Sequence, residues 1–145
     1  MINKFEGKYA FLSNFYTSAI QEDGITYPTI EHYFQAQKTL NPFERKKIAA
    51  AATPGQAKRA GRNVTLRKDW EEIKNSVMLQ GLRLKFAVPE LAEKLLATGD
   101  AELIEGTTWH DNIWGNCSCP RCENIPGENR LGKLLMQVRE EIKNN

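Results

Sequence analysis

The chain has 145 residues, of which 41% are hydrophobic, so it is long enough to bury a core without disulfide bonds or metal ions. Twenty lysines and arginines against eighteen aspartates and glutamates leave a formal net charge of +2, too small to steer the protein toward a polyanion. Any phosphate or nucleic-acid contact must therefore come from a local cluster. We find neither a secretory-signal pattern nor an apolar run of membrane-spanning length, so we expect a cytoplasmic protein without membrane contacts.

The first part of the chain predicts a small antiparallel sheet. Residues 9–16 and 19–27 are rich in β-branched and aromatic residues, which is typical of strands. Within the second segment, Asp23-Gly24 is a pair that tolerates the positive φ angles of a tight hairpin turn.

Six helical segments are predicted after this sheet, each from a capping residue, a proline or an apolar periodicity. They begin near Thr29, Asn41, Thr53, Asp69, Pro89 and Leu131. Residues 101–109 are predicted as a strand and residues 111–129 as a long loop. No repeat, low-complexity tract or linker divides the chain, so we expect one domain over residues 1–145. The predicted fold class is α+β, mostly helical with a small antiparallel sheet.

Several motifs follow one another in an order that resembles a known family. They are Phe11-Leu12-Ser13-Asn14-Phe15, the run Glu31 to Lys38, Trp70 with Met78 and Lys85-Phe86, Glu105, Asp111, Trp114-Gly115, and the run Gly127 to Met136. In this order they resemble the NADAR (YbiA-like) family across nearly the whole chain. The resemblance implies an N-glycosidase that cleaves the bond between a nitrogen base and a phosphorylated ribose, either ADP-ribose or ribose 5-phosphate. Its substrates would be ADP-ribosylated guanine in nucleic acid or an early riboflavin-pathway intermediate, with no obligate protein partner and no cofactor for catalysis.

Glu31 and Lys38 are the predicted catalytic pair. Cleaving an N-glycosidic bond develops positive charge at the ribose C1, which a nearby carboxylate stabilises. Glu31 falls in the first turn of a helix, where the macrodipole favours a negative charge, although complementing that dipole is a sufficient role for many such acids. Lys38 follows by two helical turns on the same face, and the family chemistry is thought to include a lysine adduct with the opened ribose. Solvent exposure is the ordinary state of a lysine, and Lys85 is the alternative amine.

Asp111 and two tryptophans extend the predicted site. Asp111 lies between a predicted strand and a loop, from which it would orient ribose hydroxyls or act as a second acid or base; an Asx turn with Asn112 is the competing interpretation. Trp70 and Trp114 offer flat faces for stacking a base, a contact worth about 1 to 3 kcal/mol. Trp70 could equally belong to the core.

Further substrate contacts are predicted at Phe11, Asn14, Arg59 and Asn129. Phe11, Asn14 and Asn129 belong to the motifs that carry the resemblance. Arg59 is part of a basic cluster that would bind a phosphate or pyrophosphate, although such a run is commonly a solvated surface. The members of this cluster are Lys58, Arg59, Arg62, Arg67 and Lys68.

The segment from His110 to Cys122 departs from the family pattern, because many members have only a short turn after Trp114-Gly115. Cys117, Cys119 and Cys122 are the three cysteines of the chain, and with His110 they could bind a structural zinc ion. Reduced thiols without a metal are the other interpretation. An alternative function follows: a non-catalytic module that binds nucleotide or nucleic acid, with a zinc-stabilised cysteine-rich loop.

Overall fold

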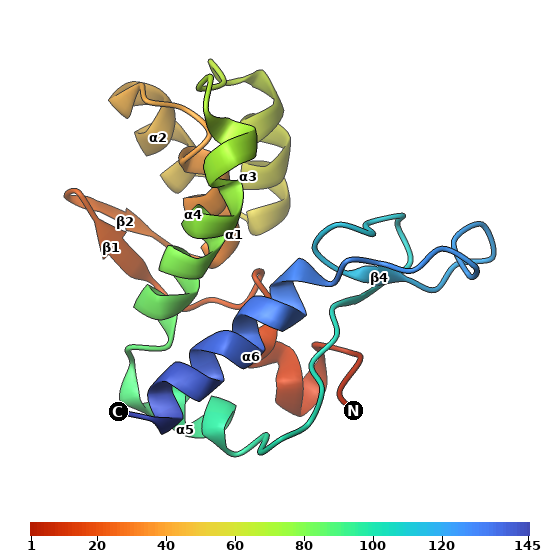
Figure 1. The fold of residues 1–145 in the computed structure, drawn as a ribbon. Coiled ribbons are helices and arrows are strands. Elements are labelled where there is room, and N and C mark those ends of the chain that lie inside the picture. Colours follow the sequence, from red (N-terminus) through yellow and green to blue (C-terminus); the bar gives the residue numbers. More distant parts are fainter. The chain divides into compact units, whose positions relative to one another are not determined.

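The computed structural model describes residues 1–145, and the chain divides into two compact units (Figure 1). The central unit comprises residues 14–85, and the terminal unit comprises residues 1–13 together with residues 86–145. Together they contain six α-helices and two pairs of short strands, so the predicted α+β class is confirmed. That the chain forms one domain stays a prediction. No helix is long and apolar enough to cross a membrane.

The central unit is a β-hairpin followed by helices. Its elements are β1 (Ile20–Glu22), β2 (Ile25–Tyr27), α1 (Ile30–Ala36), α2 (Pro42–Ala49), α3 (Pro54–Ala60), the 3-10 turn η2 (Gly61–Asn63) and α4 (Trp70–Lys85). The strands pair antiparallel with Ile20 opposite Tyr27, and the turn residues Asp23 and Gly24 both have positive φ, as predicted. Helix α1 packs against α2, α3 and α4, and all seven of its residues are buried.

The N-caps of α1, α2 and α3 confirm the predicted helix starts. The side-chain oxygens of Thr29, Asn41 and Thr53 accept hydrogen bonds from backbone N–H groups of the first helical turns. Each cap satisfies a donor that the helix geometry leaves without a partner, which typically stabilises a helix by about 1 kcal/mol. Because Thr29 fixes where α1 begins, it also places Glu31 in the first turn.

The terminal unit is built from both ends of the chain. It contains the 3-10 helix η1 (Gly7–Leu12), α5 (Pro89–Leu96), β3 (Gly106–Thr107), β4 (Asn116–Cys117) and α6 (Arg130–Lys143). Helices α5 and α6 pack together, and the Arg139 guanidinium of α6 donates to Thr98 Oγ1 and to the carbonyl of Ala101. A long loop, residues 108–128, runs through β4 and leads into the N-terminus of α6 (Figure 1).

Of the predicted strands, one is absent and another is much shorter than predicted. Residues 9–16 do not form a strand: η1 covers residues 7–12, closed by bonds such as Ser13 N–H to the carbonyl of Ala10, and it buries Phe11 and Leu12. The stretch 101–109 contains only the two residues of β3 and a bridge from Leu103 to Ile2. Strands β3 and β4 pair in parallel, because the chain between them returns to run in the same direction. Only the β1–β2 pair is therefore antiparallel, as predicted.

Lys85, the last residue of α4, is fully buried, and burial lowers the pKa of its amine to about 7. The unfolded chain binds this proton more tightly than the folded chain between pH of about 7 and about 10.5. The free energy of unfolding should therefore rise with pH through this range, by at most about 1.4 kcal/mol per pH unit from this group.

Lys85→Met should remove this rise, because methionine has no proton to lose. Urea unfolding at pH 7, 8 and 9 would measure the difference in slope between the variant and the wild type. Lys46→Met, at an exposed lysine of α2, is the control and should keep the wild-type slope. Equal slopes in all three proteins would show that burial does not perturb the Lys85 amine.

Candidate active site

Glu31 is a buried carboxylate at the N-terminal end of α1. Its side chain is 8% exposed, and its Oε1 accepts a hydrogen bond of 2.8 Å from Gln35 Nε2. The backbone N–H of Glu31 donates to the carbonyl of Asn14 over 3.1 Å, which ties the predicted N-terminal motif to this helix. A buried charge is costly unless it is hydrogen-bonded, and the helix N-terminus supplies further positive potential. The site thus holds a negative oxygen in the interior.

Two buried acceptors close to Glu31 have no hydrogen-bond partner. They are Oδ1 of Asn14 and Oε1 of Gln35. The other end of each amide is used: Asn14 Nδ2 donates to Met78 Sδ over 3.6 Å, and Gln35 Nε2 binds Glu31. Buried polar atoms are paired in the great majority of cases, so unpaired acceptors beside a carboxylate are a functional signal. They suit the hydroxyl or N–H groups of a ligand.

Gly61 holds the Gln35 side chain in place by having none of its own. A Cβ at residue 61 would lie 2.0 Å from Gln35 Oε1 and 2.9 Å from the amide carbon. Any other residue would push the Gln35 amide away from Glu31. Gly61 is also the C-cap residue of α3. Its contact with Gln35 depends on tertiary packing that no local pattern reveals.

Lys38 lies in the turn after α1 and not on the helix itself. The helix ends at Ala36, and the backbone N–H of Lys38 donates to the carbonyl of Gln35. The prediction that Glu31 and Lys38 share one helical face is therefore wrong in its geometry, because the helix ends two residues before Lys38. The two side chains nevertheless interact electrostatically: the negative charge of Glu31 raises the pKa of Lys38.

The pKa of Lys38 is lowered overall because burial outweighs Glu31. Burial disfavours the charged amine, Glu31 opposes it, and the cations of Arg62, Lys58 and Lys74 add to the lowering. Lys38 is accordingly closer to the neutral, nucleophilic form than an exposed lysine. Two members of the predicted basic cluster, Lys58 and Arg62, are thus near the candidate amine.

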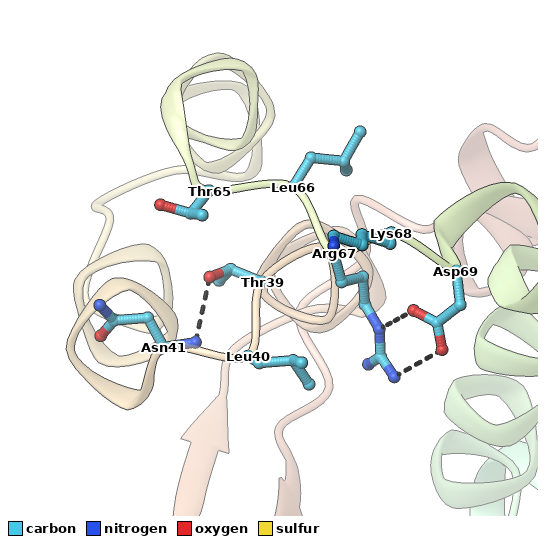
Figure 2. Close-up of a pocket in the computed structure, with 8 residues that line it drawn as sticks. All are labelled: Thr39, Leu40, Asn41, Thr65, Leu66, Arg67, Lys68 and Asp69. Atoms are coloured by element: carbon cyan, nitrogen blue, oxygen red, sulfur yellow. Dashed lines mark hydrogen bonds and ion pairs between the residues drawn. The ribbon is translucent and has the colours of Figure 1, made fainter.

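Arg67, another member of the basic cluster, adjoins Lys38 through its backbone. Arg67 forms an ion pair with Asp69 over 2.6 Å and hydrogen-bonds through its backbone to the carbonyl of Lys38. Arg67 and Asp69 line a hollow of about 480 Å³. Figure 2 shows their ion pair among the residues that line it. The hollow is lined by Thr39, Leu40, Asn41, Thr65, Leu66, Arg67, Lys68 and Asp69. Arg59 is exposed on α3, and its phosphate contact stays a prediction.

Lys85 and Trp70 occupy interior positions of the central unit. The Lys85 amine lies 5.5 Å from the centre of the Tyr16 ring, where the ring face attracts its cationic form. Trp70 is 5% exposed and packs edge-on against Phe34, with ring centres 5.0 Å apart. This contact is that of a core residue, the alternative that the sequence left open for Trp70, and base stacking on it stays a prediction.

The predicted site residues of the terminal unit are largely engaged with the protein itself. Asp111 Oδ1 accepts hydrogen bonds from the backbone N–H groups of Ile113 and Trp114, so Asp111 forms the Asx-type turn that was the competing interpretation. Asn129 has φ of 47°, and its amide bonds to the backbone of Leu103 and Glu105. These contacts are structural, and the predicted substrate roles of Asp111 and Asn129 remain untested.

Phe11 and Trp114 differ in their exposure. Phe11 is 5% exposed and packs edge-on against Phe86, with ring centres 6.4 Å apart, while Lys94 Nζ lies 5.9 Å from its ring centre. Trp114 is partly exposed, and its backbone is held by Asp111 and by Leu131. Of the two, Trp114 keeps more surface for a ligand.

His110, Cys117, Cys119 and Cys122 come together in the 108–128 loop. Their ligand atoms all lie within 4.8 Å of one another, and the cysteines form no disulfide bonds. Burial alone would raise the pKa of the Cys117 thiol, but hydrogen bonds from Cys119, His110 and Cys122 outweigh it and lower the pKa to about 6. The cluster therefore has the composition and spacing to bind a metal ion.

Comparisons with known proteins agree with this arrangement of motifs. The profile of the NADAR domain family matches residues 2–143. N-glycosidase YbiA of Shigella flexneri is 46% identical over 137 residues, covering 92% of this chain and 82% of the relative, and N-glycosidase Npun_R5314 of Nostoc punctiforme is 40% identical, covering 94% and 87%. The NMR structure of Escherichia coli YbiA superposes with a TM-score of 0.82 at 42% identity, covering 99% of this chain and 86% of that one.

The chain belongs to the NADAR domain family. The two relatives that it matches over more than four fifths of their own length carry the name N-glycosidase, so its class of enzyme is a glycosidase. A further relative, riboflavin biosynthesis protein VVA0006 of Vibrio vulnificus, is 39% identical to this chain. The match covers 92% of this chain and 36% of that protein.

The effect of the neighbouring charges on the pKa of Lys38 can be measured without an activity assay. Glu31→Gln removes the negative charge that raises the pKa of Lys38, so the pKa should fall. Arg62→Gln removes a cation that lowers the pKa of Lys38, so the pKa should rise. NMR titration of the Lys38 side chain measures both. Lys46→Gln, at an exposed lysine outside this group, should leave the pKa unchanged; shifts of the same sign in both test variants would contradict the arrangement.

Proposed function

We propose that this enzyme hydrolyses the N-glycosidic bond between a phosphorylated ribose and a nitrogen base, with Glu31 and Lys38 as catalytic residues. The observation that carries the proposal is the pairing of a buried carboxylate with an amine whose pKa burial lowers. A carboxylate stabilises positive charge at the ribose C1, and a partly neutral amine can attack the same carbon.

Glu31 acts by its negative charge. It is hydrogen-bonded by Gln35 and lies at the positive end of α1, so the ionised form is held ready before substrate binds. A charge that is already in place needs no reorganisation when the C1–N bond begins to break. The unpaired acceptors of Asn14 and Gln35 beside it receive the ribose hydroxyl groups.

Lys38 acts as the nucleophile. The ribose ring opens to an imine of the base, Lys38 Nζ forms a bond to C1, and the C1–N bond to the base breaks as the base leaves with a proton. Water then adds to C1, the C1–Nζ bond breaks, and the sugar aldehyde and the free lysine result. The sum is substrate plus water giving phosphorylated sugar plus base, with no electron transferred. Lys85 is the alternative amine, since burial lowers its pKa to about 7.

Cations near Lys38 bind the phosphate. Lys58, Arg62 and Lys74 all act electrostatically on Lys38, which places positive charge where a ribose phosphate can be bound. Arg59 lies on the same helix as Lys58 and extends this surface to a second phosphate. The same cations keep the pKa of Lys38 low until an anion arrives.

The substrate belongs to one of two classes. One is ADP-ribosylated guanine in nucleic acid; the other is an early riboflavin intermediate carrying ribose 5-phosphate, which the names of the Vibrio relative and of the maize relative PYRR favour. Asp111, Phe11, Trp114 and Asn129 of the terminal unit and Trp70 of the central unit keep their predicted substrate-binding roles in this proposal. In it, the cysteine and histidine cluster holds a structural zinc ion, and the enzyme works in the cytoplasm.

Glu31→Gln should lower turnover by about 10² to 10⁴-fold, because the swap keeps the shape and removes the charge. Chromatography and mass spectrometry after incubation with ADP-ribosylated guanine DNA, and separately with the phosphoribosylamino-pyrimidine of riboflavin synthesis, measure the released products. The class that is turned over identifies the substrate.

Glu90→Gln is the matched control for this variant. Glu90 is an exposed acid in the first turn of α5. Its replacement removes a comparable charge at a helix N-terminus without changing the proposed site. It should keep wild-type turnover. Wild-type turnover by a folded Glu31→Gln protein would remove Glu31 from the mechanism.

Borohydride should trap the lysine adduct during turnover. Reduction of the C1–Nζ double bond gives a stable secondary amine, which peptide mass mapping locates on one lysine. We expect the label on Lys38 and its loss in Lys38→Arg. Label on Lys85 would transfer the nucleophilic role to that residue, and turnover without any label would exclude the covalent step.

A further inference from the structure

The cluster of His110, Cys117, Cys119 and Cys122 has the shape of an occupied metal site. His110 Nδ1 lies 3.3 Å from the sulfur of Cys119 and 3.3 Å from the sulfur of Cys122. In a tetrahedron with Zn–S of about 2.3 Å and Zn–N of about 2.0 Å, the sulfur and nitrogen ligands are about 3.5 Å apart. These two distances are as short as those between ligands of one ion, and all four ligand atoms lie within 4.8 Å of one another.

The donor set favours zinc among the common metals. Three thiolates and one imidazole form one of the structural zinc sets, which are closed and four-coordinate. Soft sulfur ligands disfavour calcium and magnesium, which bind oxygen. The three cysteines are the whole complement of the chain, and none is in a disulfide. An odd number of neighbouring thiols also leaves one unpaired in any disulfide scheme.

Backbone groups around the cluster orient its ligands. The N–H of His110 donates to Cys117 Sγ over 3.3 Å, and Asn112 Oδ1 accepts from the N–H of Cys117. His110 has φ of 68°, a conformation that residues other than glycine rarely adopt and that persists only where the surroundings enforce it. Hydrogen bonds to ligand atoms and an enforced ligand backbone are usual around metal sites.

The loop buries few residues: within residues 108–128 only Gly115, Cys117 and Cys122 are buried. Residues 108–128 contain one strand of two residues, β4, and the exposed side chains include Trp109, Ile113 and Ile125. A segment with so small a core cannot offset its ordering entropy by burial alone. We propose that His110, Cys117, Cys119 and Cys122 bind one structural zinc ion that crosslinks this loop.

Zinc binding would also position two residues of the candidate site. Asp111 and Trp114 lie in the chain between His110 and Cys117, so they belong to the segment that the ion closes into a loop. The Asp111 carboxylate already caps the N–H of Trp114 over 2.9 Å. The ion acts on them as a positioning element, and the zinc proposal does not depend on the proposed reaction.

Metal analysis of the purified full chain tests the site. Protein produced in zinc-supplemented medium and kept reduced should contain about one zinc per chain by inductively coupled plasma mass spectrometry. Cys117→Ser and Cys122→Ser should each lower this content to a small fraction. Glu123→Gln is the matched control: it removes the carboxylate that neighbours Cys122 in the chain and should keep the metal.

Cobalt reports the ligand set even where a variant folds poorly. Zinc-free wild type, prepared with a chelator, should bind one Co²⁺ and show thiolate-to-cobalt charge transfer together with the ligand-field bands of tetrahedral coordination, which zinc then displaces. His110→Ala should change these bands while three thiolates remain. Wild-type protein that contains no zinc and binds no cobalt under reducing conditions would overturn the proposal, as would octahedral cobalt bands.

Discussion

The burial of one negative charge, that of Glu31, constrains the architecture of the central unit. A carboxylate in an interior is costly unless donors surround it, and this one is served by the Gln35 amide and the N-terminus of α1. Both interactions depend on the start of α1, which Thr29 caps, and on the packing of α2, α3 and α4 against this helix. The closeness of Gly61 to Gln35 follows from the same need, because the amide must stay where it meets Glu31.

Local sequence chemistry predicted the helices well and the irregular segments poorly. Thr29, Asn41 and Thr53 cap helices because a side-chain oxygen reaches a free N–H two or three residues on, an interaction that depends on no other part of the chain. Residues 9–16 have the composition of a strand, yet they form a 3-10 helix that buries Phe11 and Leu12. Strand formation needs a partner edge, and composition cannot show whether one is available.

The sequence motifs named candidate site residues but could not show the contacts between them. Motif order indicated Glu31, Asn14 and Lys38, but the roles of Gln35 and Gly61 arise from a contact between residues 26 positions apart. The end of α1 two residues before Lys38 also changed the relation of Lys38 to Glu31. His32, inside the same motif, hydrogen-bonds Thr29 and the carbonyl of Ala51 and so anchors α1 in the core, with both ring nitrogens occupied by the protein itself.

Opposing electrostatic effects meet at Lys38, and their order of size matters for the chemistry. Burial is the largest and favours the neutral amine; Glu31 is next and favours the cation; the surrounding cations again favour the neutral form. A lysine next to a carboxylate in water would stay charged and unreactive. Here partial burial lowers the pKa of Lys38 in spite of Glu31, and in the proposed reaction this shift favours the neutral amine that attacks the sugar.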